Sequence, residues 1–136
     1  MRVVCGALTL LVGVGALGCG GSAAGPQMHP AKGKVTYKDD GKPVTGGMVQ
    51  FESTTDPNRN GQGAIGNDGG FTLACTVGNK RVDGLAEGLY KATVSFPQGA
   101  DQSAPPPVTL PGTFKVEASG PNDFALTVPG KAKTSK

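Results

Sequence analysis

Of the three cysteines in this chain, Cys19 has the surroundings that indicate a specific reaction. It follows the small residue Gly18 at the end of an apolar run over residues 3–17, and Arg2 precedes that run. An early positive charge, a short apolar stretch and small residues at a cleavage site are typical of an export signal. In bacterial lipoproteins the cysteine after the cleavage point forms a thioether with a diacylglycerol. We therefore predict that residues 1–18 are a lipoprotein signal peptide and that Cys19 is the lipidated residue.

The same segment has an alternative interpretation as an ordinary secretory signal, because Ala16 stands where the lipoprotein pattern usually has Leu. A retained membrane helix fits less well, since a run of about fifteen apolar residues is short for a bilayer. One acyl chain attaches a protein marginally, whereas several hold it durably. With Cys19 lipidated, the expected partner is a membrane, and the expected location is the periplasmic or outer-membrane face of a bacterial envelope.

The remaining cysteine and the single histidine do not suggest catalysis. Cys75 shares one face of an alternating stretch with Phe71 and Leu73, and we expect a small, buried, apolar residue there. Removing residues 1–18 and lipidating Cys19 leaves Cys75 without a disulfide partner. His29 falls in the segment before the folded domain, where we expect it to be solvated. The chain is therefore predicted not to be an enzyme, and no cofactor is expected.

One loop has the oxygen spacing of a calcium site. Asp56, Asn58 and Asn60 occupy positions 1, 3 and 5 of a calcium loop, and a glycine follows at position 6. Position 12 falls on Asn67 instead of a bidentate Glu, and Arg59 adds an opposing charge. We expect a polar loop and no metal, with Asp56, Asn58 and Asn60 kept as the calcium candidates.

The elements that position these residues are predicted to be strands. Glycine and proline supply 34 of the 136 residues, and tryptophan is absent. Apolar and polar residues alternate with the period of a half-buried strand in several short segments separated by turn residues. The strands are expected at residues 31–38, 47–53, 64–66, 71–73, 89–96, 113–118 and 123–128. Asn67 to Gly70 suggest a hairpin turn between the third and fourth of them.

These strands predict an all-β fold, a seven-stranded sandwich of the prealbumin-like or Ig-like kind over residues 31–128. Residues 19–30 then form the lipidated cysteine and a flexible tether, and residues 129–136 form a basic disordered tail. Net charge is +3, with acidic and basic residues interspersed, so nothing indicates a nucleic-acid partner.

Several motifs together resemble a known family. They are Gly33-Lys34-Val35, Asp40-Gly41-Lys42-Pro43-Val44, Gly47-Met48-Val49-Gln50-Phe51, Asn67-Asp68-Gly69-Gly70-Phe71-Thr72-Leu73 and Gly88-Leu89-Tyr90-Lys91-Ala92-Thr93-Val94. In this order they resemble the carboxypeptidase regulatory-like (transthyretin-like) domain, especially its small lipoprotein form in planctomycete bacteria. The resemblance covers residues 31–128 and implies a non-catalytic sandwich. It assigns no functional residue, because the shared positions are turn and core residues.

We therefore expect an envelope lipoprotein whose sandwich has a structural or binding role, with an envelope protein or a polysaccharide as partner. Two alternatives remain open. A carbohydrate- or peptidoglycan-binding module predicts exposed aromatic side chains on one sheet, for which Tyr37 is the candidate. A calcium-dependent adhesion module would use the loop at Asp56, Asn58 and Asn60.

Overall fold

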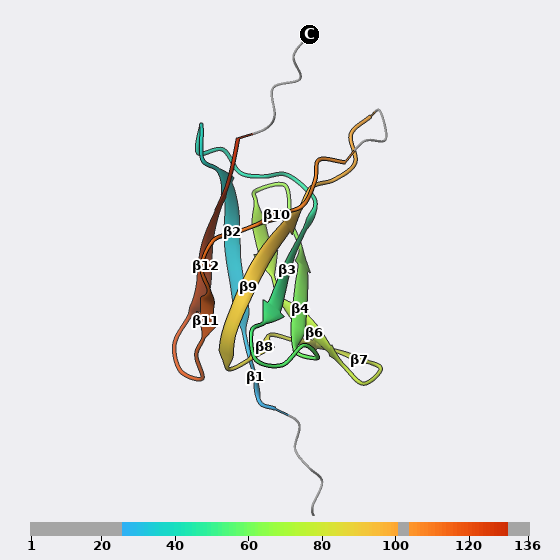
Figure 1. Ribbon diagram of the computed structural model, residues 1–136, viewed down its shortest axis with the longest axis vertical. Helices are drawn as coiled ribbons and strands as arrows, with labels where there is room; N and C mark the ends of the chain where they lie inside the picture. Colours follow the sequence, from blue (N-terminus) through green and yellow to red (C-terminus); the bar gives the residue numbers. More distant parts are fainter. Residues whose placement is uncertain (1–25, 101–103, 131–136) are drawn as a thin grey trace, which may run out of the picture.

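The computed structural model describes residues 26–100 and 104–130, and all of its regular elements are strands (Figure 1). In chain order they are β1 (Met28–His29), β2 (Ala31–Tyr37), β3 (Met48–Ser53), β4 (Asn60–Ala64), β5 (Gly70–Thr72), β6 (Ala74–Val77), β7 (Lys80–Asp83), β8 (Leu85–Ala86), β9 (Gly88–Ser95), β10 (Val108–Thr109), β11 (Phe114–Val116) and β12 (Asn122–Val128). The all-β prediction is confirmed. Within these residues no helix is long and apolar enough to cross a membrane.

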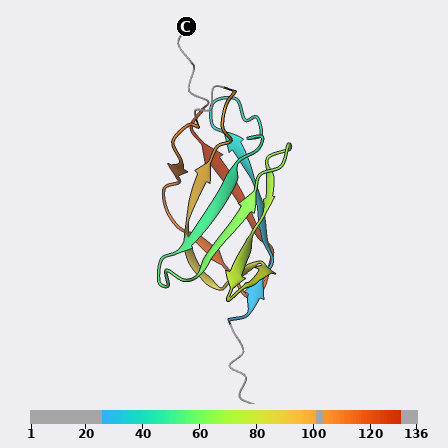
Figure 2. The same ribbon diagram turned by 90° about the vertical axis from the view of Figure 1, so that its right-hand side faces the viewer.

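The strands form a sandwich of two main sheets (Figure 2). The larger sheet has the order β10-β9-β3-β4-β6-β7, and β11 also pairs with β9. The smaller sheet has the order β12-β2-β5, in which β12 runs parallel to β2 over seven residue pairs. A two-stranded sheet of β1 and β8 lies at one end. The predicted sandwich is confirmed, with more and shorter strands than expected.

Alternating side chains build the core between the two sheets. Val49 and Phe51 of β3 and Tyr90, Ala92 and Val94 of β9 are all at most 1% exposed. The Phe51 ring lies at the centre of an aromatic cluster, with ring centroids 5.1 to 6.4 Å from those of its four neighbours. Burying these rings stabilises the folded domain through the hydrophobic effect and ring-to-ring contacts.

The predicted hairpin between residues 64–66 and 71–73 is wrong. Its turn forms, since the Gly66 N–H donates to the Gly70 carbonyl at 2.8 Å. The flanking strands enter different sheets, however, because β5 pairs with β2 instead of β4. This pairing is extended by bonds from Val35 N to Gly69 O at 2.9 Å and from Leu73 N to Ala31 O at 2.8 Å. The turn therefore connects the two sheets.

Residues 60–63, which lie between the expected strands at 47–53 and 64–66, also belong to a strand. β4 begins at Asn60 and pairs with both β3 and β6. Its glycines are required by their neighbours: a Cβ on Gly61 would lie 2.1 Å from Leu85 Cδ2, and one on Gly63 would lie 2.3 Å from Thr72 O. A strand whose inward positions are glycines shows no hydrophobic alternation, so the sequence pattern indicated a loop.

The described chain begins and ends at opposite ends of the sandwich. β1 and β8 lie at one end, together with the β6–β7 hairpin, and β12 leads to the other (Figure 1). The end of β3 pairs with the start of β9, and the 54–59 loop follows directly. This loop therefore lies at the same end of the sandwich as β1. The turns after β2 and before β3 belong to the opposite end.

Candidate functional site

Cys19 and the predicted signal peptide, residues 1–18, lie outside the described residues, as do residues 20–25 and most of the predicted basic tail, residues 131–136. The described chain begins at Pro26, seven residues after Cys19.

The predicted tether over residues 19–30 contains a strand. Met28 pairs with Ala86 and His29 pairs with Leu85 in the β1–β8 sheet. His29 is 9% exposed, so the prediction that it is solvated is wrong. The reason is backbone pairing, because Gly84, with φ of 98°, brings its backbone so close that an added Cβ would lie 2.3 Å from His29 O. The segment after Cys19 is therefore fixed to the sandwich from β1 onward.

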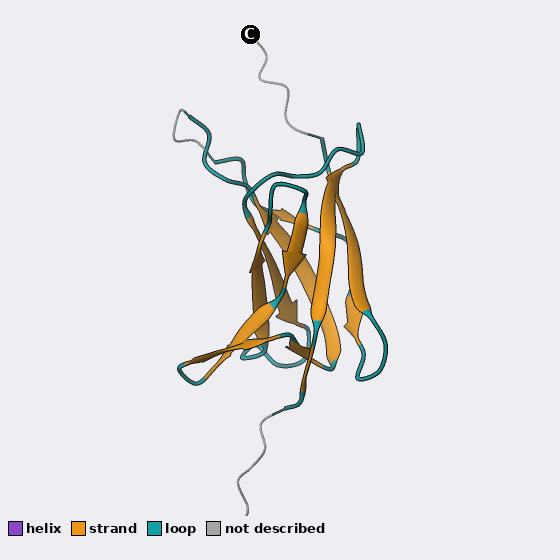
Figure 3. Cartoon of the chain, turned by 180° about the vertical axis from the view of Figure 1, so that it is seen from behind, coloured by secondary structure: helices purple, strands orange, loops and turns teal. Residues whose placement is uncertain are grey.

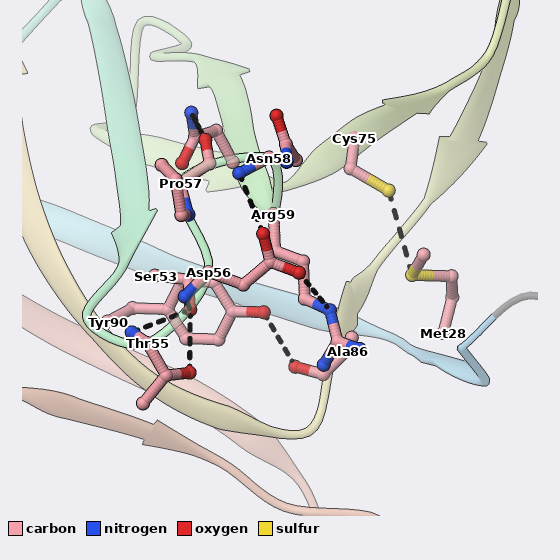
Figure 4. A network of polar contacts seen from close by, with 11 residues as sticks. Met28, Ser53, Thr55, Asp56, Pro57, Asn58, Arg59, Cys75, Ala86 and Tyr90 are labelled. Atoms are coloured by element: carbon pink, nitrogen blue, oxygen red, sulfur yellow. Dashed lines mark hydrogen bonds and ion pairs between the residues drawn. The ribbon is translucent and has the colours of Figure 1, made fainter.

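The loop with calcium-like spacing folds as a hydrogen-bonded turn (Figure 4). Asp56 Oδ1 accepts from the Asn58 N–H at 3.0 Å, and Asp56 Oδ2 lies 3.2 Å from Arg59 Nε. The Arg59 N–H donates to Asp56 O at 3.0 Å, and Asn60 Nδ2 donates to Pro57 O at 2.9 Å. Ser53 Oγ accepts from the Asp56 N–H at 3.2 Å. Several polar groups of the loop thus bond to one another.

This arrangement suits a turn better than a cation site. Both carboxylate oxygens of Asp56 are already engaged, and the Arg59 guanidinium lies where a cation would need them. Calcium requires six to eight oxygen ligands, usually including several carboxylates. Among the described residues, no three His, Cys, Asp or Glu side chains gather closely enough to hold a metal ion. The Asp56 side chain bonds to the Asn58 backbone, whereas the Asn60 side chain bonds to Pro57 O.

Cys75 is buried, as predicted, and it faces a second sulfur atom. Its Sγ lies 3.6 Å from Met28 Sδ, and the side chain is 7% exposed (Figure 4). Burial raises the pKa of the Cys75 thiol above its ordinary value of 9.0. A thiol held protonated is a weak nucleophile. Cys75 therefore serves packing.

Beside these residues lies a hollow of about 320 Å³ at the β1 end. Apolar groups form most of its wall: Pro26, Met28, Cys75, Val77, Leu85, Ala86 and Tyr90. Asp56, Asn58 and Arg59 form its polar rim. The lining comes from β1, the 54–59 loop, β6, β8 and β9. Since these segments are distant in sequence, no spacing or periodicity could have revealed the hollow.

Tyr37, the candidate for carbohydrate binding, packs against another aromatic side chain. Its ring is parallel to that of Phe96 within 6°, with the centroids 6.5 Å apart, and both side chains are partly buried against the core. The described residues thus place Tyr37 at the edge of the core, where packing accounts for it.

The aspartates of the turns accept hydrogen bonds from backbone N–H groups of their own turns. Asp40 accepts from the Lys42 N–H at 3.1 Å, and this bond lowers the pKa of the Asp40 carboxyl. Asp68 accepts from the Gly70 N–H at 3.0 Å. Both are the side-chain-to-backbone bonds that favour Asp in turns.

A second, larger hollow is an open groove of about 640 Å³ over β2 and β5. Its charged lining is mixed: Lys32, Lys34, Arg81, Asp68 and Asp123. Gly33, Gly66 and Gly70 leave backbone accessible between these side chains. The groove therefore offers donors and acceptors on a polar surface.

Comparison with known proteins gives little further guidance. No protein-family model matches the chain, and no curated protein matches it significantly. Among solved structures, a 9R-lipoxygenase from Cyanothece PCC8801 is similar at 16% identity and a TM-score of 0.42, over 76% of this chain and 17% of that protein. The chain thus spans about a sixth of that protein, and a likeness this weak says nothing about activity.

Proposed function

We propose that this chain is a lipid-anchored β-sandwich of the bacterial envelope that acts as a structural or binding module without catalysis. Acylated Cys19 holds it at the periplasmic or outer-membrane face. The observation that carries the proposal is the entry of the chain at one end of the sandwich, through β1, only seven residues after Cys19. An anchor attached there leaves the opposite end of the sandwich directed away from the membrane.

The family resemblance supports the same proposal. The quoted motifs lie in β2, in the turn joined to it by the Thr36–Pro43 bridge, in β3, in the turn between the sheets and in β9. We propose that the domain is related to carboxypeptidase regulatory-like (transthyretin-like) domains. These motifs carry turns and core packing, so the module's partner must be recognised by other residues.

A polar polymer or an envelope protein is the proposed partner. The groove over β2 and β5 supports this choice, because its mixed charges and accessible backbone suit hydroxyl, amide and carboxylate groups. A polysaccharide whose acetylated amino sugars also bear acidic substituents carries all three groups. Peptidoglycan fragments are therefore the first probes to titrate against the protein.

Fatty-acid labelling tests the anchor. Wild type, Cys19→Ala and the matched control Cys75→Ala are expressed in a bacterium that processes lipoproteins, with a labelled fatty acid in the medium. We expect label and membrane retention in wild type and in Cys75→Ala, and loss of both in Cys19→Ala. An unlabelled wild-type protein in the soluble fraction would contradict the proposal and leave a secreted binding domain.

A further inference from the structure

Two of the three large apolar side chains that are exposed in the described part of the chain lie at the β1 end. They are Val77 and Leu89, each 43% exposed, while the third, Met48, lies at the opposite end. Val77 is the last residue of β6, before the turn of the β6–β7 hairpin. Leu89 is the second residue of β9. Burying an exposed apolar side chain of this kind under another surface lowers the free energy, so exposed apolar groups of this kind mark contact sites.

The β6–β7 hairpin projects from the body of the sandwich at this end (Figure 3). Both faces of its tip are exposed, since residues 76–81 are all open to solvent. Lys80 pairs with Val77 across the turn, whereas Arg81 pairs with Thr76 and lines the groove over β2 and β5. The ion pairs found within residues 26–100 and 104–130 involve neither cation. Asp83 ends β7 at the base of the hairpin.

The apolar hollow opens beside this tip. Val77 and Gly78 line it together with Pro26 and Met28. The exposed side chain of Val77 and an apolar hollow thus lie next to the point at which the described chain begins. Cations and apolar groups side by side are typical of segments that lie in the headgroup region of a bilayer.

The distance to the anchor restricts what can cover this surface. Pro26 is the seventh residue after Cys19, and seven residue-to-residue steps span at most about 25 Å when the chain is fully extended. An acylated Cys19 lies at the membrane surface, so the β1 end stays within that distance of the lipid headgroups.

From these observations we propose that Val77, Lys80 and Leu89 form a membrane-contact face. Its partner is the bilayer that holds the acyl chains of Cys19, so this inference rests on the proposed function. Val77 enters the interface between headgroups and acyl chains, and Lys80 contacts lipid phosphates. The contact orients the sandwich on its anchor and holds the turns around Asp40 and Asp68 away from the bilayer.

A pair of tryptophan variants tests this face. The chain has no tryptophan, so Val77→Trp and Met48→Trp each introduce the only indole. They are matched, because both positions are 43% exposed and lie at opposite ends of the sandwich. Each full-length lipidated variant is reconstituted into phosphatidylcholine vesicles in which part of the lipid carries bromine on its acyl chains. Bromine quenches indole emission at short range.

We expect Val77→Trp to lose most of its emission and shift it to shorter wavelength, while Met48→Trp keeps its emission. Adding Lys80→Glu to Val77→Trp should reduce the quenching, most strongly when the vesicles contain phosphatidylglycerol. Equal, weak quenching of both tryptophans in protein that floats with the vesicles would overturn the membrane-contact face and leave the anchor intact. Protein that carries no acyl chain and does not float would instead overturn the proposed function.

Discussion

Tyr90 combines packing and hydrogen bonding in one side chain. Its ring is 1% exposed and packs on Phe51, while its hydroxyl donates to the Ala86 carbonyl at 2.8 Å. A tyrosine near the start of a strand that bonds back to the preceding corner is a recurring feature of β-sandwiches. Here it fixes the corner between β8 and β9 and closes one wall of the hollow at the β1 end.

Removing the Tyr90 hydroxyl tests the contribution of this hydrogen bond to stability. Tyr90→Phe keeps the ring and leaves the Ala86 carbonyl without its donor, so we expect the free energy of unfolding to fall by about 1 kcal/mol. Urea denaturation measures the change. The other tyrosine provides the control, because Tyr37 lies partly exposed at the rim of the core, and Tyr37→Phe should change stability much less. Equal effects of the two substitutions would contradict a specific role for the Tyr90 bond.

Burial of Cys75 predicts a loss of stability at alkaline pH. Burial raises the pKa of the thiol in the folded protein above 9.0, its value when exposed. Its contribution to stability is therefore fully present below pH 9.0 and is lost as the pH rises through the folded pKa. Cys75→Ala removes this dependence. We expect the unfolding free energy of wild type to decrease more steeply above pH 9.0 than that of the variant, and parallel curves would refute the prediction.

At the scale of elements, the crossing between the two sheets depends on a close backbone contact. β4 pairs with β6 as far as Gly61 and Gln62, and Gly63 then passes beside Thr72 of β5. A Cβ on Gly63 would lie 2.3 Å from the Thr72 carbonyl oxygen, so one of the two strands would have to move. The absence of a Cβ at Gly63 thus lets one turn join strands of different sheets.

Gly63→Ala should therefore destabilise the sandwich by about 3 kcal/mol, as overpacking at a rigid position does. Thermal and urea unfolding measure the loss. Gly78→Asn is the matched control, since Gly78 has φ of 61° and nothing within 4 Å of an added Cβ. Asn tolerates that conformation, so the control should remain close to wild type. A stable Gly63→Ala protein would show that the strands can separate without cost.

The strands with regular alternation were predictable from the sequence. Residues 31–38, 47–53, 89–96 and 123–128 match β2, β3, β9 and β12 within one residue at each end. β1 and β8 were not predicted, because two residues are too few to show a period. The sheet partner of β5 was not predictable either. The turn after Ala64 has the same local bonds whether its two flanking strands pair with each other or enter different sheets.

Prediction of the candidate site shows a similar limit. The Asp56 loop was found from its spacing, and its turn chemistry follows from local bonds alone. The hollow and the membrane-contact face are built from segments that lie far apart in the sequence, between Pro26 and Leu89. A local sequence pattern does not show which distant segments pack together.

At the scale of the whole molecule, Asn122 joins the beginning of the domain to its end. Its Oδ1 accepts from the Glu117 N–H at 2.8 Å, and its Nδ2 donates to Glu117 O at 3.0 Å and to Pro30 O at 3.2 Å. The side chain is 7% exposed. One buried amide thus connects the loop before β12 with the residue between β1 and β2.

Asn122→Ala should lower the free energy of unfolding by about 2 to 3 kcal/mol, because it leaves buried backbone groups unpaired. Asn122→Asp is a sharper variant, since it keeps the acceptor for the Glu117 N–H and loses both donors. We expect the Asp variant to be destabilised as well at neutral pH, as measured by urea denaturation. Wild-type stability in Asn122→Asp would show that the bonds to the two carbonyls contribute nothing.

The parallel pairing of β2 and β12 has a mechanical consequence. The described chain enters beside the start of β2 and leaves after the end of β12, at opposite ends of the molecule (Figure 1). Tension between an anchored amino terminus and a partner gripping the carboxyl end would pull these strands past each other along their length. All seven residue pairs then bear the force together in shear, instead of opening one after another. The rate of forced unfolding, more than the equilibrium stability, would decide how long this domain survives under load.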